Sequence, residues 1–186
     1  MRRPVSVLLG LSLCALPALA AAQAPPQAPA AADPNPITAA AKSQFGMIKG
    51  YVTRTAEKVP EDAYAFKPTP EVRSLGQLLG HIANANFMIC SRAAGEKSPS
   101  AEDIEKTKTT KADLSKALAD SFAYCDGVFA KMDDKAGAEA VDFFRQKQPK
   151  LAVLQFNTAH DFEHYGNLVT YMRLKGIVPP SSEGGM

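Results

Sequence analysis

Four stretches of this chain carry apolar residues at the spacing of an α-helix, and none alternates strictly between polar and apolar residues as a half-buried strand does. They span roughly residues 38–58, 75–94, 110–129 and 150–175. Each helix has one apolar face to bury, so the pattern predicts an all-α fold, a four-helix bundle with long connections. Only residues 141–144 would fit a short irregular or extended piece, and residues 100–106 an extra helical turn.

The second predicted helix has the clearest boundaries. Ser74 and Gln77 stand three residues apart, the spacing of a capping box, in which each side chain binds the other residue's backbone N–H. Gly95 suits the left-handed position that follows a helix. Pro149 precedes the fourth helix, and Gly176 ends it.

The amino terminus is typical of an exported precursor. Arg2 and Arg3 precede an apolar run, Val5–Leu16, and small residues around Ala20 offer a cleavage site. Residues 1–22 are therefore predicted to be a signal peptide, and the product to be secreted or periplasmic. The apolar run is too short to span a bilayer as a helix, so no stable membrane anchor is expected.

The remaining chain divides into three parts. Residues 23–36 are rich in Ala and Pro and are predicted to be a linker. Residues 37–178 would form the bundle, and residues 179–186 a flexible tail. Removing Arg2 and Arg3 from 21 basic and 19 acidic residues leaves a formally neutral chain. Without a cluster of basic residues, neither nucleic acid nor a membrane surface is an expected partner.

Cys90 and Cys125 both lie in predicted helices of the mature chain. An exported protein can form disulfides, and two facing helices can bring their Cα atoms within bonding range. Alternatively, both cysteines are small buried apolar residues. The sequence leaves the two possibilities open, because the choice depends on how the helices are rotated.

The three histidines of the chain have the spacing of a metal site. His160 and His164 are one turn apart and share a helix face. His81, from a neighbouring helix, would complete a site of three nitrogens with an open position, as in catalytic zinc sites. Zinc, nickel and iron(II) all suit such a donor set, so a divalent metal ion is the expected cofactor.

Helical angles place the three imidazoles beside the apolar stripes, where a groove between two helices would meet solvent. Two carboxylates next to the histidines, Asp161 and Glu163, could orient the rings. Asn157, one turn before His160, could face a substrate or a neighbouring loop. In the alternative interpretation the three histidines are ordinary packing and polar-network residues.

The sequence offers no nucleophile of its own. It contains neither a Gly-x-Ser-x-Gly motif nor a glycine-rich phosphate loop. Asp161 follows His160 where a zinc protease would have Glu, and Cys90 projects roughly opposite His81. Any chemistry must therefore come from the ion, which can activate water or a thiol or polarise a carbonyl.

Two blocks resemble the DinB-like superfamily. They are the Gln-Leu-Leu-Gly-His-Ile-Ala-Asn-Ala-Asn run at 77–86 and the Asn-Thr-Ala-His-Asp-Phe-Glu-His-Tyr-Gly-Asn run at 157–167, which continues to Pro180. The resemblance implies a four-helix bundle, often dimeric, with His81, His160 and His164 as metal ligands. Its characterised members join low-molecular-weight thiols to electrophiles in the cytoplasm. Such thiols are not expected outside it, so the reaction of an exported member stays open.

Three functions remain in competition. The first is a metal-dependent transferase or hydrolase acting on a small-molecule substrate. The second is a non-catalytic metal-binding or stress-response protein of the envelope, in which the ion fastens two helices together. The third is an envelope interaction module whose histidines bind no metal.

Overall fold

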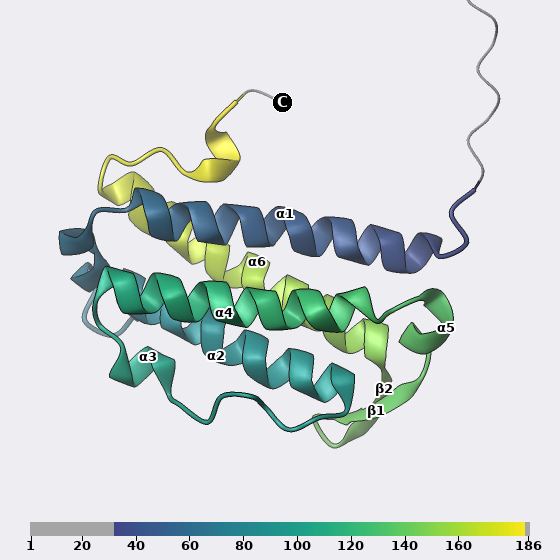
Figure 1. Ribbon diagram of the computed structural model, residues 1–186. Coiled ribbons are helices and arrows are strands. Elements are labelled where there is room, and N and C mark those ends of the chain that lie inside the picture. Colours follow the sequence, from purple (N-terminus) through teal and green to yellow (C-terminus); the bar gives the residue numbers. More distant parts are fainter. Residues whose placement is uncertain (1–31, 185–186) are drawn as a thin grey trace, which may run out of the picture. The chain divides into compact units, whose positions relative to one another are not determined.

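Four long helices, formed by the four apolar stretches, make up the body of the structure (Figure 1). This computed structural model describes residues 32–184. The predicted signal peptide and most of the linker, residues 1–31, lie outside the described residues. The long helices are α1 (Pro36–Lys58), α2 (Leu75–Ala94), α4 (Lys111–Ala130) and α6 (Lys150–Leu174). The prediction of an all-α four-helix bundle is confirmed.

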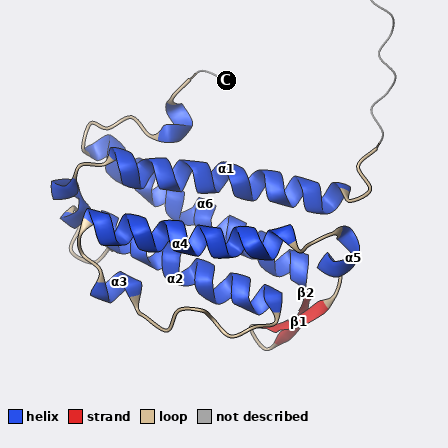
Figure 2. Ribbon diagram, in the orientation of Figure 1, coloured by secondary structure: helices blue, strands red, loops and turns tan. Residues whose placement is uncertain are grey.

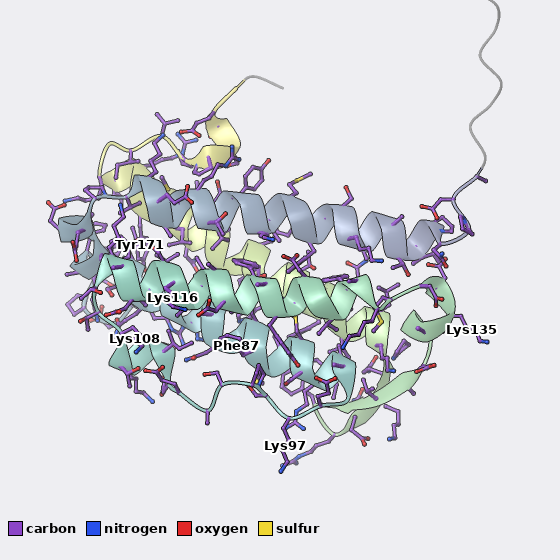
Figure 3. All side chains as sticks on the ribbon, viewed as in Figure 1. Phe87, Lys97, Lys108, Lys116, Lys135 and Tyr171 are labelled. Carbon is purple, nitrogen blue, oxygen red and sulfur yellow. A yellow bond between two sulfur atoms is a disulfide. The ribbon has the colours of Figure 1, made fainter. Side chains whose placement is uncertain are left out.

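Each long helix packs mainly against two others, in the cyclic order α1, α4, α2, α6. The core between them contains an aromatic group from α1 and α4, in which the ring of Phe45 stacks on that of Phe129 with centroids 4.6 Å apart. Charged side chains such as Lys97 and Lys135 extend away from the helices (Figure 3). In the part of the chain that the structure describes, no helix has the length and apolar character needed to cross a membrane.

The boundaries of α2 follow the predicted signals. The Ser74 hydroxyl accepts a hydrogen bond from the backbone N–H of Gln77 at 3.1 Å, and the Ser74 N–H donates to Oε1 of Gln77 at 2.9 Å. Gly95 ends the helix with a φ of 74°, in the left-handed region that glycine adopts without steric cost. The capping box and the glycine stop are therefore both present as predicted.

Short elements fill the connections (Figure 2). The 3-10 helix η1 (Glu61–Ala65) and the single-turn helix α3 (Ile104–Thr107) flank α2 in sequence, and α5 (Asp134–Gly137) follows α4. The turn expected within residues 100–106 thus forms at α3, slightly later in the chain than predicted.

A β-hairpin joins α5 to α6, where the sequence suggested only a short extended or irregular piece at 141–144. Strands β1 (Ala140–Phe143) and β2 (Gln146–Pro149) pair antiparallel, with Phe143 opposite Gln146. The two turn residues, Phe144 and Arg145, have φ angles of 44° and 62°. Such turns usually contain Asn-Gly, so the sequence lacks the ordinary hairpin signal.

The start of the predicted loose tail lies against the bundle: Pro179 and Pro180 are buried, while residues 181–184 are exposed. Pro180 is buried in the 3-10 helix η2 (Pro180–Ser182). The hydroxyl of Tyr165 on α6 accepts a hydrogen bond from the Ser181 N–H at 2.9 Å. Glu183 forms an ion pair with Lys58 of α1.

The structure joins Cys90 of α2 to Cys125 of α4 by a disulfide. Their Cα atoms are 5.4 Å apart, and both side chains are fully buried. Of the two possibilities that the sequence left open, the structure therefore contains the disulfide.

Candidate metal centre

The three histidines of the chain meet at the junction of α2 and α6. These helices run antiparallel, and His81 of α2 lies opposite His160 and His164 of α6. Nε2 of His160 is 3.3 Å from Nε2 of His81 and 3.1 Å from Nε2 of His164. The structure thus brings together all three residues that the sequence proposed as ligands.

The nitrogen spacing suits a shared ion. Two nitrogens bound to one zinc ion at about 2.0–2.1 Å stand about 3.3 Å apart when the bond angle is tetrahedral. The observed separations of 3.1 and 3.3 Å are near this value. One potential ligand atom from each histidine lies within 4.8 Å of the other two. The three side chains could therefore hold a divalent metal ion with only small adjustments.

Burial favours the neutral form of the imidazole, which metal binding requires, at two of the three histidines. Burial is the main cause that lowers the pKa of both His81 and His164. The site is nevertheless open to small molecules, because the side chain of His81 is 25% exposed and that of His160 is 16% exposed. A ligand could therefore reach the point where the three nitrogens meet.

Glu105 orients the ring of His81, a role that the sequence analysis missed. Oε2 of Glu105 is 2.9 Å from Nδ1 of His81, and Oε1 accepts a hydrogen bond from Nε of Arg73 at 2.8 Å. A proton on Nδ1, donated to the carboxylate, leaves the Nε2 lone pair facing the other histidines. Glu163, one of the two carboxylates proposed for this role, is exposed and makes no such contact.

Gly80 explains how Glu105 comes so close to α2. A Cβ atom at Gly80 would lie 2.8 Å from the Cα of Glu105, so only glycine allows this approach. Asn84, one turn later, holds the start of α3: its Oδ1 accepts a hydrogen bond from the Ile104 N–H at 3.0 Å. A glycine directly before His81 could have indicated that another segment packs closely against this helix, but the sequence does not identify that segment.

Asp161 lies behind His160 rather than in solvent. It is fully buried, and burial raises its pKa to about 6. Its Oδ1 is 3.9 Å from Nδ1 of His160, which is too long for a hydrogen bond, and neither atom has another partner among residues 32–184. A small rotation of either side chain would let Nδ1–H donate to this carboxylate, as Glu105 allows for His81. The carboxylate of Asp161 would then hold the Nδ1 side of the His160 ring, while Nε2 on the other side of the ring faces an ion shared with His81 and His164.

Asn157 faces the interior, so neither suggested partner, a substrate or a neighbouring loop, is correct. Its amide nitrogen donates to Oδ1 of Asn86 on α2 at 2.7 Å and lies 3.4 Å from Oδ2 of Asp161. Asn86 in turn donates to the hydroxyl of Ser121 on α4 at 3.2 Å. The network connects three helices beneath the histidines.

A model of the DinB superfamily matches residues 49–168, which include all three histidines. The chain belongs to the DinB superfamily. The resemblance seen in the sequence is confirmed, and the bundle is the fold of this family.

Several relatives share this fold. The uncharacterized protein YjoA of Bacillus subtilis is 25% identical over 138 residues, which cover 72% of this chain and 88% of YjoA. Its crystal structure, that of a DinB-like protein, has a TM-score of 0.62 at 24% identity and covers 82% of this chain and all of that one. A DinB-like protein from Bacillus cereus has a TM-score of 0.67 at 18% identity, with 78% and 95% covered. A mycothiol-dependent maleylpyruvate isomerase has a TM-score of 0.59 at 16% identity, with 70% and 60% covered.

Glu105→Ala in this DinB protein is expected to weaken zinc binding by about 10- to 100-fold, because His81 loses the group that orients it. Glu105→Gln should retain part of the affinity, since its amide oxygen can still accept the Nδ1 proton. Isothermal titration calorimetry measures the effect. Glu102→Gln changes a carboxylate of the same loop that pairs with Lys108 and should bind zinc as the unmodified protein does. Unchanged affinity in Glu105→Ala would contradict the orienting role.

Proposed function

We propose that this DinB protein binds one divalent metal ion through His81, His160 and His164, and that it is a metal-dependent transferase or hydrolase of a small molecule. The observation that carries the proposal is the convergence of three Nε2 atoms from two helices at separations of 3.1 and 3.3 Å. Three nitrogen ligands leave coordination positions free for an exchangeable ligand. When bound, the ion would supply an activated water or thiol or a polarised carbonyl.

The residues around the histidines support a reactive centre. Glu105 holds His81 by its outer nitrogen, and the amide oxygen of Asn167 lies 3.3 Å from the outer nitrogen of His164. Two of the three rings therefore have partners that direct Nε2 towards the common point. Zinc, nickel and iron(II) are the candidate ions.

We further propose that the protein acts outside the cytoplasm after removal of residues 1–22. The disulfide between Cys90 and Cys125 supports export, since such bonds persist in oxidising compartments. Protein purified from its own envelope fraction, without added metal, is expected to carry one ion per chain. The mass of the purified protein, measured by mass spectrometry, should equal that of the chain without residues 1–22. Elemental analysis that finds no transition metal would count against the metal centre.

The second candidate is a non-catalytic protein in which the ion fastens α2 to α6. It is favoured by the burial of His164, which is only 8% exposed and lies at the helix junction. A panel of small electrophiles and esters separates the two functions. Turnover by the zinc-loaded protein that is lost in His81→Ala would support the enzyme. Equal rates in both proteins, with stability still dependent on zinc, would support the second candidate.

A further inference from the structure

The β-hairpin places an aromatic group on α6 one helical turn from His160. Phe156 lies one turn before His160, so the two side chains share a face of α6, with Cβ atoms about 5–6 Å apart. The rings of Phe143 and Phe144 pack on Phe156, with centroid distances of 5.2 and 5.6 Å. Met88, two turns after His81 on the same face of α2, lines a cavity with Phe143 and Phe144. We call these four apolar residues the hairpin pocket.

The hairpin pocket is concave and open to solvent. Phe143 and Phe144 line two adjoining cavities of about 290 and 310 Å³, one bounded by Phe156 and the other by Met88. Phe144 is 66% exposed, and Phe156 and Met88 are 43% and 44% exposed. Grouped apolar side chains of this exposure mark binding surfaces, and the volumes are at the lower end of small-molecule sites.

The charges around the cavity favour an acidic ligand. Arg92 and Arg145 both line the 310 Å³ cavity, and within residues 32–184 neither forms an ion pair. Asp142, the carboxylate of the same cavity, pairs with Lys147 at 2.9 Å. Two guanidinium groups therefore remain to pair with a carboxylate, which arginine can bind through two parallel hydrogen bonds.

The turn of the hairpin holds two of the residues that line these cavities, Phe144 and Arg145, in unfavourable backbone conformations. Phe144 and Arg145 occupy consecutive left-handed positions, with φ angles of 44° and 62°, where Asn and Gly are preferred. Residues held in such conformations are typical of binding and catalytic sites. A turn selected for stability alone would not carry a Phe and an Arg.

We propose that the hairpin pocket holds the apolar part of the substrate on which the three-histidine centre acts. The substrate is an aromatic or aliphatic carboxylate: its acid group pairs with Arg92 and Arg145, and its reacting end extends past Phe156 towards His160. The inference rests on the proposed function, which supplies the ion at His160.

The pairing of the acid group with Arg92 and Arg145 can be tested with 4-phenylbutanoate and its amide, 4-phenylbutanamide. Both are titrated into the zinc-loaded mature protein. Calorimetry or NMR titration is expected to show the acid binding at least about tenfold more tightly than the amide. The double variant Arg92→Gln, Arg145→Gln should remove this preference. Arg54→Gln, an arginine of α1 that stacks on Tyr51, is the matched control and should retain it.

A second variant separates binding from folding. Phe144→Asn combined with Arg145→Gly supplies the preferred turn sequence, so the melting temperature should be retained or raised while binding of the acid is lost. Cobalt(II) in place of zinc should broaden the NMR signals of the bound acid if the pocket adjoins the histidines. Both results together would support the proposal.

The following outcomes would overturn it: equal binding of acid and amide, binding that persists in the Asn-Gly variant, or no cobalt broadening. A dimer in sedimentation experiments that dissociates in the Asn-Gly variant would assign the pocket to contact between two copies instead. A zinc titration of the same sample distinguishes the failures. Zinc binding without arginine-dependent acid binding removes this inference alone, whereas failure to bind zinc removes the proposed function.

Discussion

His160→Ala is expected to weaken zinc binding by at least about 100-fold. Loss of a residue that only orients a ligand costs 10- to 100-fold, and His160 is itself one of the three proposed ligands, with its Nε2 within 3.3 Å of Nε2 of both other histidines. Zinc at about 100 times the dissociation constant stabilises a folded protein by about 2.7 kcal/mol. The unmodified protein should therefore gain about 5–10 °C in melting temperature with zinc, and the variant almost nothing.

Thr170→Ala provides the control for this experiment. Thr170 is exposed on the same helix, beyond the histidines, and its substitution should leave both the zinc affinity and the zinc-dependent melting shift unchanged. Differential scanning fluorimetry with a chelator as reference measures the shift. If His160→Ala gained as much stability from zinc as the unmodified protein, the ion would bind elsewhere.

Removing the disulfide with Cys90→Ala and Cys125→Ala is expected to lower the free energy of unfolding by roughly 3–4 kcal/mol. The bond closes a loop between residues 35 positions apart, and its loss restores that freedom to the unfolded chain. Both sulfurs are fully buried between α2 and α4, so some packing is lost as well. Urea denaturation followed by circular dichroism measures the change.

A chemical control separates the cross-link from the packing. Unmodified protein that is unfolded in urea, reduced and kept under reductant should lose most of the same stability, because it lacks the cross-link but keeps both sulfurs. The additional loss in the double alanine variant measures the packing of the sulfurs. Oxidised and reduced samples with equal urea midpoints would show that the bond contributes nothing measurable. Either preparation should still bind zinc if it folds, because neither cysteine contacts a histidine ring.

Signals within one helix were sufficient for much of this structure. Ser74, Gln77 and Gly95 predict where α2 begins and ends because caps depend on neighbours within a few residues. The spacing of His160 and His164 similarly predicts that they share a face. His81 could be added because its helical angle places it beside an apolar stripe, and an apolar stripe packs against a neighbour.

Features that depend on two elements meeting could not be predicted. Glu105 lies 24 residues after His81, and nothing in its own segment says that α3 folds back against Gly80. Asn157 lies on the same side of its helix as the histidines, but the sequence could not reveal that Asn86 stands opposite it. The pairing of Cys90 with Cys125 likewise depends on the rotation of α2 against α4. The hairpin turn was not predicted, because Phe144 and Arg145 occupy turn positions where Asn and Gly are usual.

The buried amide pair of Asn86 and Asn157 has a consequence for the longitudinal alignment of α2 and α6. Apolar surfaces tolerate sliding, but a slip of one residue, about 1.5 Å, would break their 2.7 Å hydrogen bond. Two amides stranded away from water would cost about 1–3 kcal/mol each. Metal–ligand distances tolerate only about 0.2 Å. The hydrogen bond between Asn86 and Asn157 therefore helps to hold α2 and α6 at the longitudinal position in which the histidine nitrogens of the two helices meet.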